Sequence, residues 1–270
     1  MSLLKYKCHT RHLLATITQA FIKDCCCELC LGPIGQPGHS PSFLCQACFN
    51  DLPAIPPSCS HCSEPLSHPK AGQTHQRCLR CQLHPPEYDY SHYRFLFQSP
   101  VDLWIRAAKD KRQEHWLGRL SELMLDKPPA SLSRVDGLVV IPSHWLARWK
   151  RGYNPAEILT RQISHRTGIP IIRNALHKRY ARDQRHLSAK ERHRNLAHTL
   201  LAGQQTLDQA HILVIDDVMT TGATASAAAV ALKQQGASIV GIWALARTPP
   251  ARFMVHNAAS ITGGRHHDPL

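Results

Sequence analysis

Four pairs of cysteines, each with two residues between its members, restrict the fold of this chain more than any other feature of its sequence. A two-residue spacer lets one tight turn direct two thiolates at a metal ion about 2.3 Å away, and two such turns complete a tetrahedron. Fourteen residues lie between the first and second pairs and fifteen between the third and fourth, which are lengths typical of zinc ribbons. The predicted metal ligands are Cys27 and Cys30, Cys45 and Cys48, Cys59 and Cys62, and Cys78 and Cys81.

Eight thiolates are the number that two tetrahedral zinc ions require, and sites made only of cysteine leave no position open for water. The sequence therefore predicts two structural zinc ions. Sequential pairing joins the first two turns in one site and the last two in the other, whereas interleaved pairing joins the first with the third and the second with the fourth. The spacing leaves both schemes open. An iron–sulfur cluster is a further alternative, because such clusters also bind to cysteine thiolates alone.

Composition divides the chain into two main parts. Residues 25–86 contain ten of the eleven cysteines, with many prolines and glycines, so this part needs crosslinks in place of a hydrophobic core. From Tyr88 onward, short apolar runs alternate with segments of helical spacing, which predicts an α/β fold, a parallel sheet flanked by helices. The expected organisation is an amphipathic segment at 1–24, a double zinc-ribbon module at 25–86, the α/β domain at 88–247, and a tail at 248–270 that could be disordered.

Hydrophobic periodicity predicts the individual elements of the α/β part. Residues 88–97 alternate with aromatics and predict a strand or hairpin, and residues 101–125 have helical spacing. The polar segment 173–199 is rich in arginine and histidine, and we expect it to be mobile or to contact a ligand. Further strands are predicted at 137–141, 169–172, 211–215 and 238–246, and further helices at 154–166 and 224–235.

The chain is strongly basic, with a formal net charge of +13 and an isoelectric point near 9.5. Such a surplus favours nucleic acid or phosphorylated small molecules as partners, although a protein that is merely basic has the same composition. The apolar run 13–22 is shorter than the ~20 residues that a bilayer requires. Lys23 and Asp24 stand before Cys25, where a lipoprotein signal needs small uncharged residues. We therefore expect a cytoplasmic protein without a transmembrane segment.

The segment 214–224 carries the most specific chemistry. It reads Val-Ile-Asp-Asp-Val-Met-Thr-Thr-Gly-Ala-Thr, an apolar strand with two carboxylates and a threonine and glycine loop that opens into an alanine-rich helix. Backbone N–H groups at a helix N-terminus can surround a phosphate, because the helix dipole favours negative charge there. The carboxylates can accept hydrogen bonds from ribose hydroxyls or hold a divalent ion through water. The predicted sugar-phosphate site consists of Asp216, Asp217, Thr220, Thr221, Gly222, Ala223 and Thr224.

Segment 214–224 resembles the phosphoribosyl-pyrophosphate signature of type I phosphoribosyltransferases. Together with the cysteine pairs and the Lys-Arg-Gly-Tyr-Asn sequence at 150–154, it resembles the ComF family, including its GntX-type proteins, from about Cys27 to Arg247. The resemblance implies a type I phosphoribosyltransferase-like sheet, phosphoribosyl pyrophosphate bound with Mg²⁺, and a link to natural transformation, the uptake of single-stranded DNA. It also implies a pyrophosphate side made of Lys109, Pro142, Ser143, Arg148, Lys150 and Arg151.

Three functions fit these features. The first is binding of phosphoribosyl pyrophosphate combined with handling of single-stranded DNA. The second is an active phosphoribosyltransferase on an unknown acceptor. Thr220 stands where purine transferases often carry an aspartate, and Leu146 and Ala147 occupy positions that are basic in similar proteins, which favours binding over catalysis. The third is a zinc-dependent adaptor for DNA-uptake proteins with a vestigial pocket.

A basic stretch in segment 173–199 supports the first function, because its side chains could contact the phosphates of a DNA strand. The alternative is a solvated helix face, and aromatic residues for base stacking are few in this stretch. The candidate DNA-binding residues are Lys178, Arg179, Arg182, Arg185, Lys190, Arg192 and Arg194.

Overall fold

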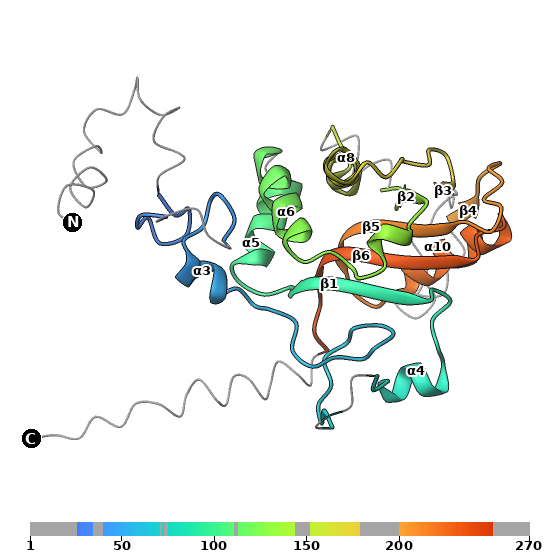
Figure 1. Cartoon of the computed structure of the whole chain (residues 1–270), viewed down its shortest axis with the longest axis horizontal. Coiled ribbons are helices and arrows are strands. Elements are labelled where there is room, and N and C mark those ends of the chain that lie inside the picture. The colour runs from blue at the N-terminus through green and yellow to red at the C-terminus, as the bar shows by residue number, and fades with distance from the viewer. Residues whose placement is uncertain are drawn as a thin grey trace, which may run out of the picture. The chain divides into compact units, whose positions relative to one another are not determined.

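The computed structural model describes residues 26–34, 40–70, 72, 75–110, 113–143, 152–178 and 200–250. The chain divides into two compact units, Met1–Pro53 and Ala54–Leu270. The smaller unit contains the first two cysteine pairs, and the larger unit contains the other two pairs together with the sheet (Figure 1).

A four-stranded parallel sheet forms the centre of the larger unit. Its order is β1-β6-β5-β2, and Ile171 extends it past β2 through a parallel bridge to Leu138. The strands β5 and β6 are buried along most of their length, as expected for a parallel sheet that is covered on both faces. The predicted fold class is thereby confirmed. The strands are β1 (Tyr90–Leu96), β2 (Gly137–Val140), β5 (His211–Met219) and β6 (Ile239–Arg247).

Helices cover both faces of this sheet. α6 (His115–Asp126) and α8 (Pro155–Thr167) pack against each other and against the strands, and α10 (Ala223–Gln234) packs on the other face (Figure 1). A short antiparallel pair, β3 (Leu176–Lys178) and β4 (Leu200–Ala202), lies beside α10. Strand alternation explains this division, because Ile212 and Val214 on β5 belong to the apolar cluster that includes the alanines of α10.

Two of the predicted elements differ from the structure, the helical stretch 101–125 and the strand at 169–172, which is reduced to a single bridge at Ile171. The stretch 101–125 forms two helices, α5 (Val101–Asp110) and α6. Each helix has an apolar face at helical spacing, and the residues between them are polar. The apolar pattern therefore does not show where the first helix ends. Of the two alternatives for segment 88–97, the structure has the strand, β1, which pairs in parallel with β6. The remaining elements are the short helices α3 (Gln46–Asn50) and α4 (Leu79–Leu83) and the 3₁₀ turn Leu132–Arg134.

The second cysteine segment is part of the core of the larger unit. Its four cysteines are between 0% and 6% exposed and join the apolar cluster that includes Tyr88, Tyr93 and Met219. The segment 84–89 contacts α10. The Lys233 ammonium on this helix donates to the Glu87 carbonyl at 2.8 Å and pairs with Asp89 at 3.0 Å. A metal site in this segment would therefore be continuous with the core beneath α10.

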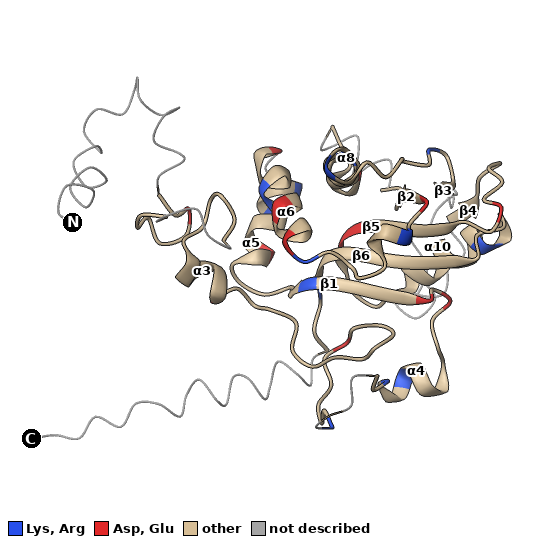
Figure 2. Cartoon of the chain, in the orientation of Figure 1, with Lys and Arg blue, Asp and Glu red and all other residues tan. Residues whose placement is uncertain are grey.

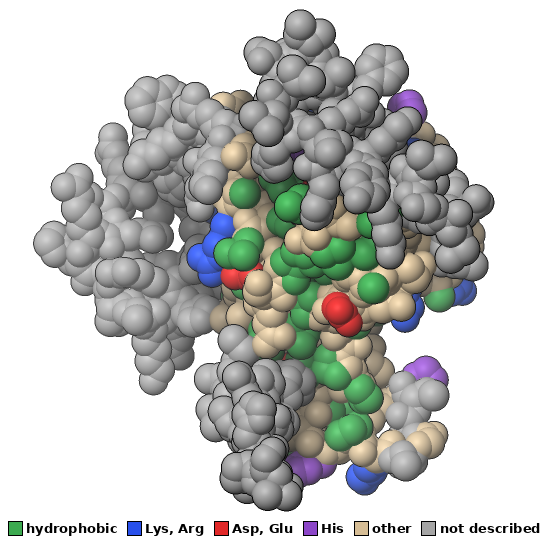
Figure 3. All heavy atoms as spheres, turned by 90° about the vertical axis from the view of Figure 1, so that its left-hand side faces the viewer, with side chains coloured by type: hydrophobic (Ala, Val, Ile, Leu, Met, Phe, Trp, Pro, Cys, Tyr) green, Lys and Arg blue, Asp and Glu red, His purple; other side chains and the backbone are tan. Residues whose placement is uncertain are grey.

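Apolar side chains also reach the surface of the described part of the chain, as Figure 3 shows for one face. Among the residues that the structure describes, no helix combines the length and apolar character needed to cross a bilayer. The large apolar side chains that are exposed are Leu29, Leu31, Leu79, Leu83, Leu103, Leu201, Val230 and Ile239.

Candidate functional site

The eight predicted metal ligands form two groups of four. In each group the sulfur atoms all lie within 4.8 Å of one another. The Sγ atoms of Cys30 and Cys45 are 3.8 Å apart, and those of Cys62 and Cys78 are 3.7 Å apart. Two sulfurs bound at about 2.3 Å to one tetrahedral zinc would be about 3.8 Å apart, so each group has the size of a single-zinc site. The pairing is sequential, and the interleaved scheme is excluded.

Both groups are built from the same motif. In each, the amide of the first cysteine donates to the carbonyl five residues later, and its carbonyl accepts the amide four residues later. The residue that follows each turn has a positive φ, 60° in the first copy and 51° in the second. The second cysteine pair then opens a short helix, α3 in one copy and α4 in the other. The distances are 2.7 and 2.9 Å for Cys27 to Gly32 and Leu31, and 2.9 Å each for Cys59 to Glu64 and Ser63.

The two groups differ in burial. In the smaller unit Cys30 is exposed, and Cys45 and Cys48 are partly exposed, whereas all four cysteines of the second group are buried. A hydrogen bond from Cys62, together with nearby backbone amides, lowers the pKa of Cys59 to about 4 against the effect of burial. A lowered pKa favours the thiolate, which is the form that binds zinc.

The loop between β5 and α10 leaves backbone amides without partners at the start of a helix. Gly222 adopts a left-handed conformation with φ 82°, which favours glycine, and a Cβ atom there would lie only 3.0 Å from Met219 Cε. The hydroxyl of Thr221 accepts the amide of Ala223 at 3.4 Å. Among the residues that the structure describes, the amides of Thr221, Gly222 and Thr224 donate to no other group. These three donors are available to a ligand at the start of α10.

Two carboxylates lie just before this loop, in the acidic segment of β5 (Figure 2). Asp217 is 7% exposed, and its Oδ2 lies 2.6 Å from the Nζ of Lys109 at the end of α5. Asp216 Oδ1 accepts the amide of Asp217 at 2.9 Å. Burial, and then repulsion from Asp217, raise the pKa of Asp216 to about 7, while Lys109 acts in the opposite direction. A neighbouring pair in which one carboxylate has such a raised pKa is typical of ligand and catalytic sites.

Replacing Lys109 with methionine is expected to lower the free energy of unfolding by about 1–2 kcal/mol at pH 8, because the buried carboxylate of Asp217 would lose its cation. The matched control is Lys233→Met, which removes an ion pair of 3.0 Å between half-exposed groups and should cost less than about 1 kcal/mol. Urea unfolding of both variants measures the difference. Equal losses would show that the Lys109 pair has no special role.

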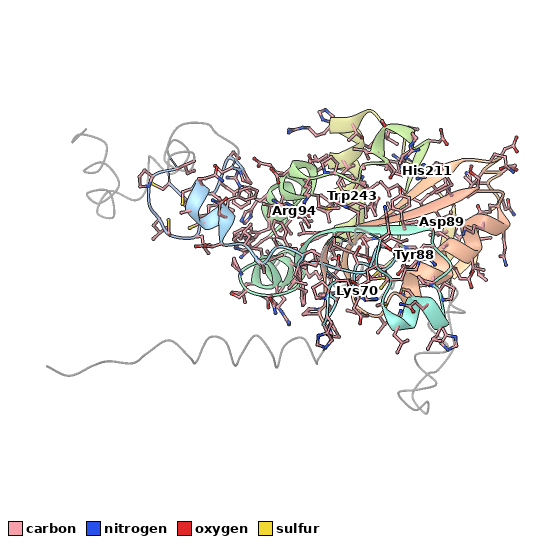
Figure 4. The ribbon with its side chains drawn as sticks, turned by 60° about the horizontal axis from the view of Figure 1, so that its bottom comes forward. Lys70, Tyr88, Asp89, Arg94, His211 and Trp243 are labelled. Carbon is pink, nitrogen blue, oxygen red and sulfur yellow. The ribbon has the colours of Figure 1, made fainter. Side chains whose placement is uncertain are left out.

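Two arginines without a local signal in the sequence donate hydrogen bonds to backbone carbonyls of this loop. Arg80, on α4 of the second cysteine group, donates from Nη2 to the Thr221 carbonyl at 2.7 Å. Arg247, at the end of β6, is 2% exposed and donates from Nη1 to the carbonyls of Met219, at 3.2 Å, and of Thr220. Tyr88, labelled in Figure 4, is buried, and its hydroxyl lies 3.5 Å from the position of a Cβ at Gly222. The contacts join residues that are far apart in the chain, since Arg80 is 141 residues from Thr221 and Arg247 is 27 residues from Thr220.

The predicted pyrophosphate side is described only in part. Pro142 and Ser143 follow the carboxyl end of β2, and Pro142 lines a cavity of about 300 Å³ together with Asn154. The Nδ2 of Asn154 donates to the Ile141 carbonyl at 3.1 Å, and the Tyr153 hydroxyl donates to the Ala108 carbonyl, beside Lys109. The Ser143 hydroxyl is buried and has no hydrogen-bond partner in the described part. Arg148, Lys150 and Arg151 lie outside the described residues.

The predicted DNA-binding stretch lies almost entirely outside the described residues. Lys178, at the end of β3, is half-buried, and burial lowers the pKa of its ammonium. The residues of this set that are not described are Arg179, Arg182, Arg185, Lys190, Arg192 and Arg194.

The fold and these sites define a class of protein, an α/β protein with a four-stranded parallel sheet that carries two tetracysteine motifs. The chain is 28% identical over 213 residues to Competence protein F of Haemophilus influenzae, in an alignment that covers 76% of this chain and 90% of the relative. It is 27% identical over 228 residues to DNA utilization protein YhgH of Salmonella typhimurium and 28% identical to that of Escherichia coli K12, with 82% of this chain and 96% of each relative covered. The resemblance to ComF proteins stated from the sequence is confirmed by these relatives.

Solved structures similar to the chain include two phosphoribosyltransferases. Orotate phosphoribosyltransferase from Aeropyrum pernix matches with a TM-score of 0.31 and 14% identity, over 54% of this chain and 69% of that one. Purine phosphoribosyltransferase from Pyrococcus horikoshii matches with a TM-score of 0.29 and 17% identity, over 55% of this chain and 82% of that one. No family model matches the chain.

Proposed function

We propose that this protein binds phosphoribosyl pyrophosphate with Mg²⁺ at the loop between β5 and α10, and that it acts in the handling of single-stranded DNA during natural competence. The observation that carries the proposal is the set of three amides, on Thr221, Gly222 and Thr224, that have no partner in the described part of the chain. They stand at the N-terminus of a twelve-residue helix, where a phosphate is favoured.

The carboxylates next to these amides match the rest of such a ligand. A 5-phosphate at the start of α10 would bring the ribose toward the end of β5, where Asp216 and Asp217 could accept hydrogen bonds from its hydroxyls. Mg²⁺ prefers oxygen ligands and keeps several waters, so it could be held between the pyrophosphate and these carboxylates. Lys109 would supply a cation on the same side of the site.

Two further observations support the DNA role. The relatives are named Competence protein F and DNA utilization protein YhgH, and the second name refers to the use of DNA. The chain also carries a formal net charge of +13, which favours binding to a polyanion.

The two tetracysteine groups have the size for zinc, and zinc there would stabilise the fold without an open coordination position.

Calorimetric titration with phosphoribosyl pyrophosphate, with and without Mg²⁺, tests the pocket directly. Binding that requires Mg²⁺ is the expected result, and no binding in either condition would refute the pocket and favour an adaptor with a vestigial site. Release of pyrophosphate in the presence of candidate bases would instead establish the alternative of an active transferase on one of them.

The DNA role is tested by measuring affinity for a single-stranded oligonucleotide against salt. For single strands, the slope of log affinity against log salt changes by about 0.7 for each phosphate contact. The double variant Arg185→Ala/Lys190→Ala is therefore expected to reduce the slope by about 1.4. Arg77→Ala, an exposed arginine outside this stretch, is the control. Absence of binding by the unmodified protein at low salt would end the DNA-handling proposal.

A further inference from the structure

We propose that Arg80, and with it the second tetracysteine motif, is a positioning element for the phosphate loop. This inference rests on the proposed binding of a sugar phosphate at that loop. It starts from one contact, the hydrogen bond of 2.7 Å from Arg80 Nη2 to the carbonyl of Thr221.

The hydrogen bond from Arg80 to the Thr221 carbonyl also determines the direction of the next backbone N–H group. In a planar trans peptide, the carbonyl of one residue and the N–H of the next point in opposite directions. Arg80 holds the Thr221 carbonyl, so the Gly222 amide is directed away from Arg80. Arg247 holds the Thr220 carbonyl, so the Thr221 amide is directed away from Arg247. The two arginines thus orient two of the loop amides that have no partner among the described residues.

A comparison of the two cysteine motifs distinguishes the role of Arg80 at the loop from a role in metal binding. Arg80 is the second residue between Cys78 and Cys81, and the corresponding residue between Cys45 and Cys48 in the other copy is Ala47. At this second cysteine pair the two copies match in backbone conformation, with φ/ψ of −74°/158° at Cys45 and −67°/158° at Cys78, and in the bond from the amide four residues later, at 3.0 and 3.1 Å. An alanine at this position is therefore compatible with the motif, and the arginine of the second copy is free to serve the loop.

The position of Arg80 is well defined by its surroundings. Its two cysteine neighbours, Cys78 and Cys81, belong to the buried cluster that also contains Met219 and Ala225. The chain that leaves α4 stays close to α10, because the amide of Glu87 lies 3.4 Å from the Ser226 hydroxyl, which accepts it. A zinc ion at the second group would hold both cysteines, and through them the helix that carries Arg80.

The test compares two ligands that occupy different parts of the proposed site. Ribose 5-phosphate carries the phosphate that the loop would bind, and Mg²⁺-pyrophosphate carries the other end. In Arg80→Ala, the affinity for ribose 5-phosphate is expected to fall about tenfold, with the affinity for Mg²⁺-pyrophosphate and the zinc content unchanged. Arg80→Lys keeps one donor and should recover part of the loss. Arg77→Ala removes an exposed positive charge three residues away and should change neither affinity.

The outcomes separate this inference from the proposed function. If the unmodified protein does not bind ribose 5-phosphate, the phosphate site itself is refuted. If it binds and Arg80→Ala binds equally well, only the positioning role is refuted. A parallel loss of both ligands and of zinc in Arg80→Ala would also overturn the positioning role, because it would show that the residue supports the fold.

Discussion

Asp216→Asn is expected to raise the free energy of unfolding by about 2 kcal/mol at pH 8 and to weaken binding of phosphoribosyl pyrophosphate about 100-fold. The pKa of Asp216 is raised from 3.8 to about 7, and each tenfold change in proton affinity corresponds to about 1.4 kcal/mol. Partial exposure to water reduces the full effect. The asparagine keeps an oxygen that can accept the Asp217 amide, which Asp216 accepts at 2.9 Å. It loses the negative charge that would attract Mg²⁺ and strengthen bonds to ribose hydroxyls.

The raised pKa of Asp216 also predicts how the stability difference between the variant and the unmodified protein changes with pH. Because the folded-state pKa lies above the unfolded one, folding takes up a proton at Asp216 between about pH 4 and 7. The destabilising effect of this carboxylate is therefore absent below pH 4, grows as the pH rises, and is complete above pH 7. The stability of Asp216→Asn should diverge from that of the unmodified protein over this range. Chemical denaturation at pH 4, 6 and 8 measures the divergence.

A carboxylate at the opposite end of the sheet is the control for Asp216. Asp136 Oδ2 accepts the amide of His211 at the start of β5, at 2.8 Å, far along the strand from the loop. Asp136→Asn should change the unfolding free energy by less than about 1 kcal/mol and leave ligand affinity unchanged. A destabilised Asp216→Asn, or one that binds the ligand normally, would contradict the site.

Cys62→Ser is expected to reduce the zinc content from two ions per chain to one and to prevent stable folding of the larger unit. Cys62 is 0% exposed, and its sulfur lies 3.7 Å from that of Cys78 within the core beneath α10. Binding of a structural zinc contributes on the order of 10 kcal/mol of folding free energy, which exceeds the net stability of many domains. Loss of this zinc site would therefore remove more folding free energy than the net stability expected for the larger unit.

The repeated motif supplies the matched control. Cys30→Ser removes a ligand from the first group, where Cys30 is exposed, and should also lower the zinc content to one. All five tryptophans lie in the larger unit, so their fluorescence reports its unfolding alone. We expect an unchanged unfolding midpoint for Cys30→Ser and a lost or strongly lowered midpoint for Cys62→Ser. Full zinc occupancy in either variant, or none in the unmodified protein, would refute the assignment of ligands.

Much of the site followed from local sequence pattern, because its parts are local structures. In this chain a two-residue spacer between cysteines forms a tight turn in the first pair of each group and the start of a short helix in the second. In the same way, an apolar run followed by Asp216, Asp217 and a threonine and glycine loop produces a strand end and a helix start, as β5 and α10 show. The raised pKa of Asp216 could not be predicted from sequence, since it depends on burial and on the distance to other charges.

The sequence by itself determined which residues could bind metal, where the strand-to-loop-to-helix motif lies, and that the sheet is parallel, since each depends on near neighbours in the chain. Only the tertiary structure decided that the cysteine pairs combine sequentially, that the second group is buried in the core, and that Lys109 meets Asp217. It also decided that Arg80 reaches Thr221 across 141 residues. These contacts depend on how separate elements pack, and spacing along the chain carries no record of that packing.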